Sequence, residues 1–221
     1  MSQSDSRPEP WIALALVCAK KSDSSTAILH LDKALTYNQR HLFTHQVKGT
    51  LLYEADQFKE ALVSFHAAYR ISRSLLVYEG LLNCYLKLGN TTTALAKCKD
   101  ILSTFPKSAH ALLIIGRVYS EIPGNFQKAL EYLQQSLEID AKHMDTVFAV
   151  SHLHEKNGDI QSAIDFLEKY LDVSYHSELI HVTIAELFTL NGEYEKATMH
   201  YNVVLAYTLG NLGAIQTVSV R

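Results

Sequence analysis

The sequence predicts an all-α fold, a superhelix (solenoid) made of about six similar pairs of helices. The first observation is an alanine that returns every 33 to 35 residues along most of the chain. The second is the low content of turn residues, because 9 Gly and 4 Pro in 221 residues are too few for a turn-rich β architecture. The third is a 48% share of hydrophobic residues against 19% charged, which excludes disorder for most of the chain. The recurring residues are Ala27, Ala61, Ala94, Ala129, Ala163 and Ala197.

The spacing is that of the tetratricopeptide repeat, in which two antiparallel helices make up about 34 residues. Other positions of that signature match in register around each alanine. These are Trp11, Leu14, Leu31 and Ala34 in the first repeat, Gly49, Phe58, Phe65 and Ala68 in the second, Leu81, Tyr85, Gly89 and Pro106 in the third, Ile115, Gly116, Tyr119, Leu133 and Ser136 in the fourth, Gly158 and Leu167 in the fifth, and Ala185, Phe188, Gly192, Tyr194 and Tyr201 in the sixth. The fold class is therefore a superhelix of about six tetratricopeptide repeats.

The register of these matches predicts the domain boundaries. One repeat domain covers residues 8–211, after a disordered segment at 1–7 and before a C-terminal tail at 212–221. The repeats are expected at 8–41, 42–74, 75–108, 109–143, 144–177 and 178–211. The fourth repeat carries one extra residue, which we place in the turn at 122–125, because Pro123 and Gly124 cannot continue a helix.

Each signature residue has a packing role. A small residue on the first helix is expected to meet the recurring alanine on the second, so that the two backbones approach closely. Phe65, Leu133, Leu167 and Tyr201, four residues beyond the alanine, are expected to fill the volume toward the next repeat. A glycine ends the first helix in several repeats, where a left-handed backbone is favoured.

Composition and charge exclude several classes of partner. The balance of 20 Lys and Arg against 23 Asp and Glu leaves a net charge of −3, so no basic excess is available for nucleic acid. The longest apolar run, Trp11 to Ala19, is about half as long as a membrane span, and the polar residues before it do not resemble a secretory signal. The 3 cysteines are expected to be free thiols in a reducing compartment. We predict a location in the nucleus and cytoplasm, with neither a membrane nor a nucleic acid as partner.

No motif for catalysis, cofactor binding or metal binding stands out in the sequence. The tightest histidine pair, His152 and His154, lies two residues apart on a predicted helix, so the rings point in different directions. Cys84 and Cys98 are expected to be small hydrophobic residues of a helical core. We therefore predict a protein that is not an enzyme and has neither a cofactor nor a bound metal.

The surface expected to carry the function is the concave face formed by the first helices of the repeats. The second, fifth and ninth places of each repeat are predicted to face it, as a mixed groove that binds an extended peptide through apolar anchors and charge-assisted hydrogen bonds. The candidate groove residues are Gln46, Leu76, Glu79, Asn83, Leu113, Arg117, Phe148, His152 and Glu186. Asn83 and Arg117 occupy equivalent places in consecutive repeats, so we expect them roughly 10 Å apart.

The groove lacks the residues that chaperone-binding tetratricopeptide modules use to hold a C-terminal carboxylate. Such modules place a lysine four residues before an inner-face asparagine, whereas Glu79 precedes Asn83 here and would repel a carboxylate. That subclass is excluded.

Three further segments carry a resemblance to a known family. They are the opening Glu9-Pro10-Trp11, the segment Tyr78-Glu79-Gly80-Leu81-Leu82-Asn83-Cys84-Tyr85-Leu86 and the segment Gly192-Glu193-Tyr194-Glu195-Lys196-Ala197. With the long fourth repeat, they resemble the C-terminal superhelix of the family of subunit 7 of the anaphase-promoting complex (cyclosome). The resemblance covers residues 8 to about 206.

The resemblance implies a function that the residues alone do not. It implies a non-catalytic scaffold of a ubiquitin ligase in mitotic cell-cycle control, which packs against other tetratricopeptide subunits and helps to display co-activators whose tails end in Ile-Arg. The alternative is an unrelated tetratricopeptide adaptor, for instance a ciliary, secretory or RNA-processing scaffold, that binds peptides in its concave groove.

Overall fold

The computed structural model describes residues 7–171 and 177–218, with side chains in the last helix described up to residue 209. All secondary structure in this part of the chain is helical, which confirms the predicted all-α class. None of the described helices has the length and apolar character that crossing a membrane requires. The segment predicted to be disordered, residues 1–7, lies outside the described residues except for Arg7.

The chain divides into two compact units, up to Pro106 and from Lys107 onward, close to the boundary expected between the third and fourth repeats. The first unit holds α1 (Glu9–Lys20), α2 (Ser24–Tyr37), α3 (Leu42–Glu54), α4 (Phe58–Ile71), α5 (Leu75–Lys87) and α6 (Thr91–Thr104). The second unit holds α7 (Ala109–Ser120), α8 (Phe126–Ile139), α9 (Met144–Lys156), α10 (Ile160–Glu168), α11 (Ser177–Leu190) and α12 (Tyr194–Val218).

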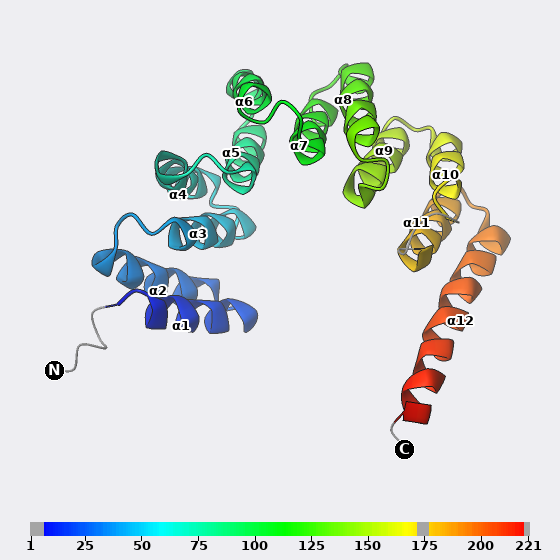
Figure 1. The fold of residues 1–221 in the computed structure, drawn as a ribbon, viewed down its shortest axis with the longest axis horizontal. Coiled ribbons are helices and arrows are strands. Elements are labelled where there is room, and N and C mark those ends of the chain that lie inside the picture. Colours follow the sequence, from blue (N-terminus) through cyan, green and yellow to red (C-terminus); the bar gives the residue numbers. More distant parts are fainter. Residues whose placement is uncertain (1–6, 172–176, 219–221) are drawn as a thin grey trace. The chain divides into compact units, whose positions relative to one another are not determined.

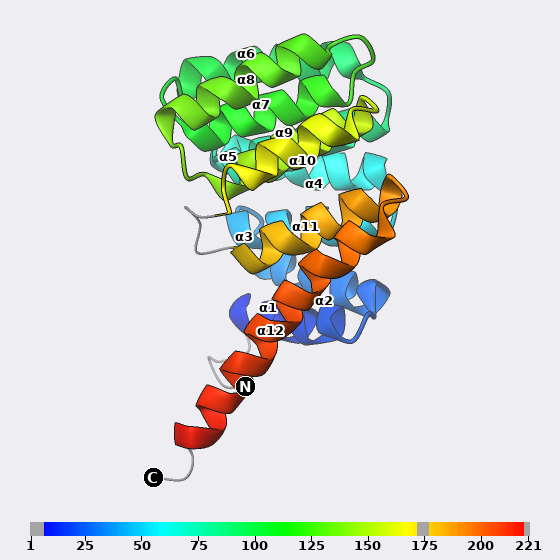
Figure 2. The same cartoon turned by 90° about the vertical axis from the view of Figure 1, so that its right-hand side faces the viewer.

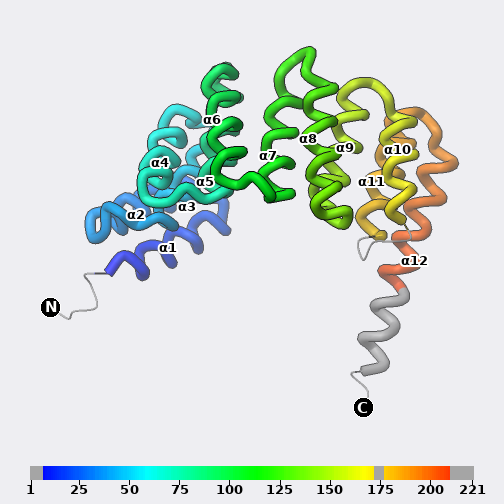
Figure 3. The backbone as a smooth tube through the Cα atoms, turned by 45° about the horizontal axis from the view of Figure 1, so that its top comes forward, coloured from blue at the N-terminus to red at the C-terminus, as the bar shows by residue number. Residues whose placement is uncertain are grey.

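Within each unit, consecutive helices pack as pairs, and each second helix also contacts the first helix of the next pair (Figures 1 and 3). First helices also contact each other, as α3 does with α5 and α7 with α9. Figure 2 shows that α12 runs beyond the start of α11, and this helix continues past residue 212, where the sequence predicted the tail to begin.

The recurring alanine lies in the tightest part of each pair. All six copies are on the second helix and are at most 3% exposed. In the fourth repeat a Cβ placed on Gly116 of α7 would lie 2.7 Å from Leu133 and 3.3 Å from the backbone oxygen of Ala129. The predicted close approach of the two helices is therefore confirmed there, and Leu133 fills the neighbouring core volume.

The turn that ends the first helix needs a left-handed residue. Gly89, Gly158 and Gly192 have φ values of 72°, 82° and 78°, as the sequence predicted. In the first two repeats the same conformation is taken by Ser22 and Asp56, with φ values of 61° and 57°. The turn geometry therefore persists where glycine is replaced, at the cost of backbone strain.

The extra residue of the fourth repeat is accommodated where it was expected. Residues 122–125 lie between the end of α7 and the start of α8, and Gly124 has a φ of 76°. The insertion lengthens the turn and leaves both helices intact.

The three cysteines are free thiols, as predicted, and all of them lie in the first unit. Cys84 and Cys98 are buried. Burial raises the pKa of the Cys84 thiol to about 11 and that of Cys98 to about 12, because a thiolate would lose its hydration there. Both therefore act as small hydrophobic side chains.

Candidate protein-interaction surface

In the first unit, four of the candidate groove residues lie on first helices. Gln46 is on α3 and is half-buried. Leu76, Glu79 and Asn83 follow one another at helical spacing on α5, so they share one side of that helix. Leu76 is 61% exposed, while Glu79 and Asn83 are half-buried. This side of α5 therefore combines an apolar side chain with a carboxylate and an amide.

A second exposed apolar residue extends this surface on α3. Phe43, which occupies the same repeat position as Leu76, is 48% exposed, and α3 contacts α5 directly. Two large apolar side chains left in water on neighbouring helices cost hydration free energy that a partner can recover by covering them.

A polar cluster of hydrogen-bonded side chains connects α5 to its neighbours α4 and α6. Asp100 of α6 accepts hydrogen bonds from Tyr69 of α4 at 2.6 Å and from Tyr78 of α5 at 2.9 Å, and Lys97 lies 3.6 Å away. The Tyr69 hydroxyl, then Tyr78 and Lys97, hold the pKa of Asp100 below its usual value, while burial raises the pKa of both tyrosines. One carboxylate thus links three consecutive helices.

A histidine makes a further link between α4 and α5. His66 Nε2 lies 2.9 Å from the hydroxyl of Tyr85. Burial, followed by the charges of Lys97 and Arg70, lowers the pKa of His66. Neither this contact nor the Asp100 cluster was predicted, because single tyrosine, histidine and aspartate residues carry no spacing signal that distinguishes them from ordinary surface residues.

In the second unit the candidate residues have mixed environments. Arg117 of α7, His152 of α9 and Glu186 of α11 are exposed, and Phe148 of α9 is half-buried. Leu113 of α7 is 1% exposed. It packs in a core cluster with Ala129, Leu133, Val150 and Leu153, so it supports the first helices from inside and does not offer a side chain to a ligand.

The expected neighbourhood of Asn83 and Arg117 stays a prediction, because Asn83 lies in the first unit and Arg117 in the second. Glu121, four residues after Arg117, accepts a hydrogen bond from Lys156 of α9 at 2.8 Å. Glu121 therefore links α7 to α9 within the second unit.

The histidine pair of α9 has the divergent geometry expected for residues two apart on a helix. His152 is exposed, with Nδ1 3.1 Å from Glu155. His154 is half-buried and packs edge-on against Phe126, with ring centroids 5.6 Å apart. The two rings have different neighbours.

Family models identify the repeat. The model described as "Tetratricopeptide repeat" matches residues 109–143, and a second model of the same description matches residues 83–108. A solved structure described as "Crystal structure of APC/C hetero-tetramer Cut9-Hcn1" aligns with a TM-score of 0.64 at 19% identity, over 92% of this chain and 40% of that one. The fold is that of a tetratricopeptide-repeat protein. The fold class predicted from the sequence is thereby confirmed.

Curated relatives confirm the predicted resemblance. The chain is 28% identical over 205 residues to "Anaphase-promoting complex subunit 7" of Arabidopsis thaliana, which covers 93% of this chain and 36% of that protein. It is 29% identical over 197 residues to the protein of the same name from Dictyostelium discoideum, which covers 89% of this chain and 34% of that protein. The chain thus spans about a third of the length of these relatives.

Proposed function

We propose that the chain is a non-catalytic tetratricopeptide scaffold of the anaphase-promoting complex, the ubiquitin ligase that acts in mitotic cell-cycle control. The observation that carries the proposal is the similarity to proteins named as its subunit 7, in a plant and in an amoeba, along about nine tenths of the chain. These two matches cover 93% and 89% of the chain, which is nearly the whole of the predicted repeat domain.

The fold and the names of the relatives support a role in binding rather than in catalysis. The matched models describe a repeat, and the relatives are named as subunits of a complex. Paired helices with exposed apolar residues on their first members, such as Phe43 and Leu76, suit the recognition of another protein. We place the chain in the nucleus and cytoplasm, where such a ligase acts.

The partners we propose are other tetratricopeptide subunits of the complex and co-activator tails that end in Ile-Arg. The first unit offers the better surface for an extended segment, since α5 aligns Leu76, Glu79 and Asn83 on one side. An apolar side chain of the ligand would cover Leu76, and its polar groups would pair with the carboxylate and the amide.

Affinity purification tests membership of the complex. The tagged full chain is expressed in cells arrested in mitosis, and the proteins that co-purify are identified by mass spectrometry. Recovery of the cullin and RING subunits of the ligase is expected. Recovery of a different stable assembly, without these two subunits, would assign the chain to the alternative class of unrelated tetratricopeptide adaptors.

A pair of substitutions tests the surface. Asn83→Ala combined with Glu79→Lys, both on α5, should weaken the binding of a synthetic peptide ending in Ile-Arg at least tenfold, because an amide contact is lost and a charge is reversed. The matched control is Glu131→Lys, which alters the charge of an exposed residue on α8, a second helix. Unchanged binding by the double variant in calorimetry would move the interface away from the first helices, even where the purification succeeds.

A further inference from the structure

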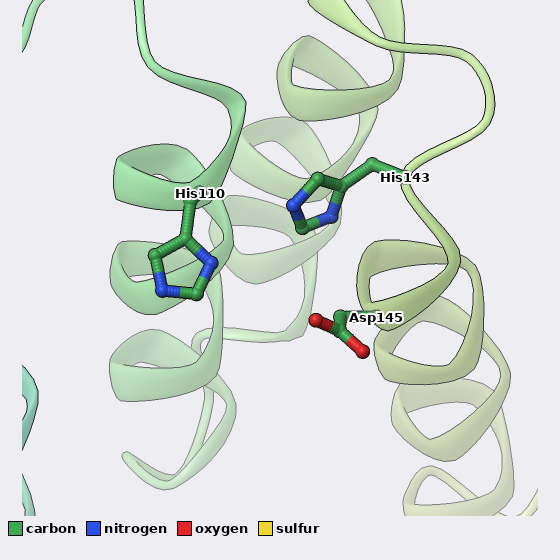
Figure 4. A group of neighbouring side chains, drawn as sticks. All are labelled: His110, His143 and Asp145. Atoms are coloured by element: carbon green, nitrogen blue, oxygen red, sulfur yellow. The ribbon is translucent and has the colours of Figure 1, made fainter. Parts of the chain in front are cut away.

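Three side chains with metal-ligand chemistry converge at the start of two neighbouring helices. His110 is the second residue of α7, His143 directly precedes α9, and Asp145 is the second residue of α9. One ligand atom of each lies within 4.8 Å of the others, and they form the one such group of three found among the described residues. Figure 4 shows a nitrogen of each imidazole and the Asp145 carboxylate directed toward the same space.

The repeat architecture explains why the three meet. The first helices α7 and α9 contact each other within the second unit, and His110 and Asp145 occupy the same place in consecutive repeats. Both histidines are half-buried, and their ring centroids are 5.9 Å apart. Asp145 is exposed, so its carboxylate can adjust to a bound ion without disturbing the core.

A relay of hydrogen bonds determines which nitrogen of His143 carries the proton. The Ser136 hydroxyl donates to the backbone oxygen of Ala109 at 2.8 Å, which uses its only proton. Across the 2.8 Å contact between Ser136 and Thr146, the Thr146 hydroxyl must therefore donate. The 2.8 Å contact between Thr146 and His143 is then donated by Nδ1–H of His143.

The consequence is that Nε2 of the neutral His143 ring has a free lone pair, and this is the nitrogen directed toward His110 in Figure 4. Histidines that ligate metals commonly donate their other ring N–H to a protein acceptor, which orients the ring. Ser136 and Thr146 are fully buried, so water does not compete for these hydrogen bonds. The relay also holds the backbone of Ala109, next to His110, so it positions both histidines.

We propose that His110, His143 and Asp145 bind a transition-metal dication of the zinc type. Two imidazole nitrogens and one carboxylate oxygen form a ligand set that suits Zn²⁺, whereas Mg²⁺ and Ca²⁺ prefer oxygen ligands alone. The set leaves at least one coordination position for water or for a side chain of a partner protein. The proposal is independent of the proposed function, and it departs from the expectation from the sequence that the chain binds no metal.

Calorimetry with zinc chloride tests the site directly. The full chain, with any polyhistidine tag removed, is expected to bind one Zn²⁺ per molecule with micromolar or tighter affinity. His110→Ala, His143→Ala and Asp145→Asn should each weaken that affinity at least tenfold. The matched control is His41→Ala, which removes the equivalent histidine before α3 in the first unit and should leave zinc binding unchanged.

Two measurements keep the test decisive if a histidine variant folds poorly. Asp145→Asn changes an exposed side chain and is expected to keep the helical circular dichroism of the wild type. Cobalt absorption spectra of the wild type report nitrogen and oxygen ligands without any substitution. Absence of saturable zinc binding by the wild type, or equal affinity in the wild type and Asp145→Asn, would overturn the proposal.

Discussion

The two units contain the same short motif, His-x-x-Thr, at the start of a first helix, yet the motif has different chemistry in each. His41 precedes α3 and His143 precedes α9, and in both cases Nδ1 lies close to the threonine hydroxyl, at 2.7 Å from Thr44 and 2.8 Å from Thr146. Both threonines are fully buried. The side chain of His41 also accepts a hydrogen bond from the backbone N–H of Thr44 at 3.3 Å, so Nδ1 of its neutral ring carries no proton.

The difference originates about ten residues earlier, on the preceding second helix. Seven residues after the recurring alanine, the first repeat has Ala34 and the fourth has Ser136. The Ser136 oxygen accepts a hydrogen bond from Thr146, so His143 must donate to Thr146 through Nδ1, whereas Ala34 offers no such acceptor. One buried hydroxyl therefore decides whether Nε2 of the capping histidine bears a lone pair or a proton.

The residue at the second place of each first helix also differs from repeat to repeat. The second and third repeats have Phe43 and Leu76 there, both exposed, while the fourth and fifth have His110 and Asp145. Equivalent repeat positions thus present an apolar side chain in some repeats and the proposed metal ligands in others. A repeat defines where a side chain projects, and the residue at that place defines what it recognises.

The prediction with the largest expected effect tests whether the two units unfold independently of each other. Ala129→Arg should destabilise the second unit by at least about 3 kcal/mol, because an arginine at this 0% exposed position overpacks the helix crossing and buries an unpaired charge. Amide hydrogen exchange should show lost protection in α7 to α10 and retained protection in α1 to α4. Equal loss along the whole chain would show that the units unfold together.

The prediction with the next largest effect tests the hydrogen-bond relay that runs from Ala109 through Ser136 and Thr146 to His143. Ser136→Ala should cost about 1–3 kcal/mol, because the part-buried backbone oxygen of Ala109 loses a donor and the buried Thr146 hydroxyl loses its acceptor, and it should allow the proton of His143 to move to Nε2. The reverse change in the first unit, Ala34→Ser, should favour a proton on Nδ1 of His41. Long-range ¹⁵N–¹H spectra of the imidazoles read the tautomers. The comparison fails if His41 and His143 have the same tautomer in the wild type.

A smaller effect is expected for the stability of the second unit at acidic pH. His181 and His200 of the second unit are in contact through their Nδ1 atoms at 2.9 Å, and burial lowers the pKa of both rings. The charge of His181 lowers the pKa of His200 further, while Glu168 opposes this. Because the unfolded rings take up protons more readily than the folded ones, stability should fall as the pH drops below the ordinary value of 6.5.

Urea unfolding of the second unit at pH 7.5 and 5.5 measures this dependence. His200→Phe, placed beside Phe188, removes one titrating ring and should reduce the difference in unfolding free energy between the two pH values. His66→Phe is the matched variant in the first unit, where burial also lowers the pKa of the ring. A pH dependence that is unaltered by His200→Phe would assign the acid sensitivity to other groups.

The smallest effect uses the cysteines as reporters of the first unit alone. Cys84 and Cys98 are buried with raised pKa values, so a thiol reagent should modify Cys18 first in the folded chain and all three only after unfolding. In the Ala129→Arg variant, Cys84 and Cys98 should remain protected. Their rapid modification in that variant would show that damage to the second unit opens the first.

Features that depend on local sequence were predicted well. The alanine period, the left-handed turns at Gly89, Gly158 and Gly192, and the extra turn residue of the fourth repeat follow from backbone preferences and side-chain volume, which act over a few residues. Leu113 shows the limit of this reasoning, because its repeat place indicated an inner face while neighbouring helices bury it.

By itself the sequence determined the class of fold, the pairing of helices and the resemblance to a known subunit, because a repeated pattern of small and large residues encodes one way of packing. Only the tertiary structure decided the chemistry of the polar groups. Asp100 reaches Tyr69 across 31 positions of sequence, and Ser136 reaches Ala109 across 27. Such contacts depend on side-chain direction and on which atom of each pair carries the shared proton, and neither leaves a periodic signal in the chain.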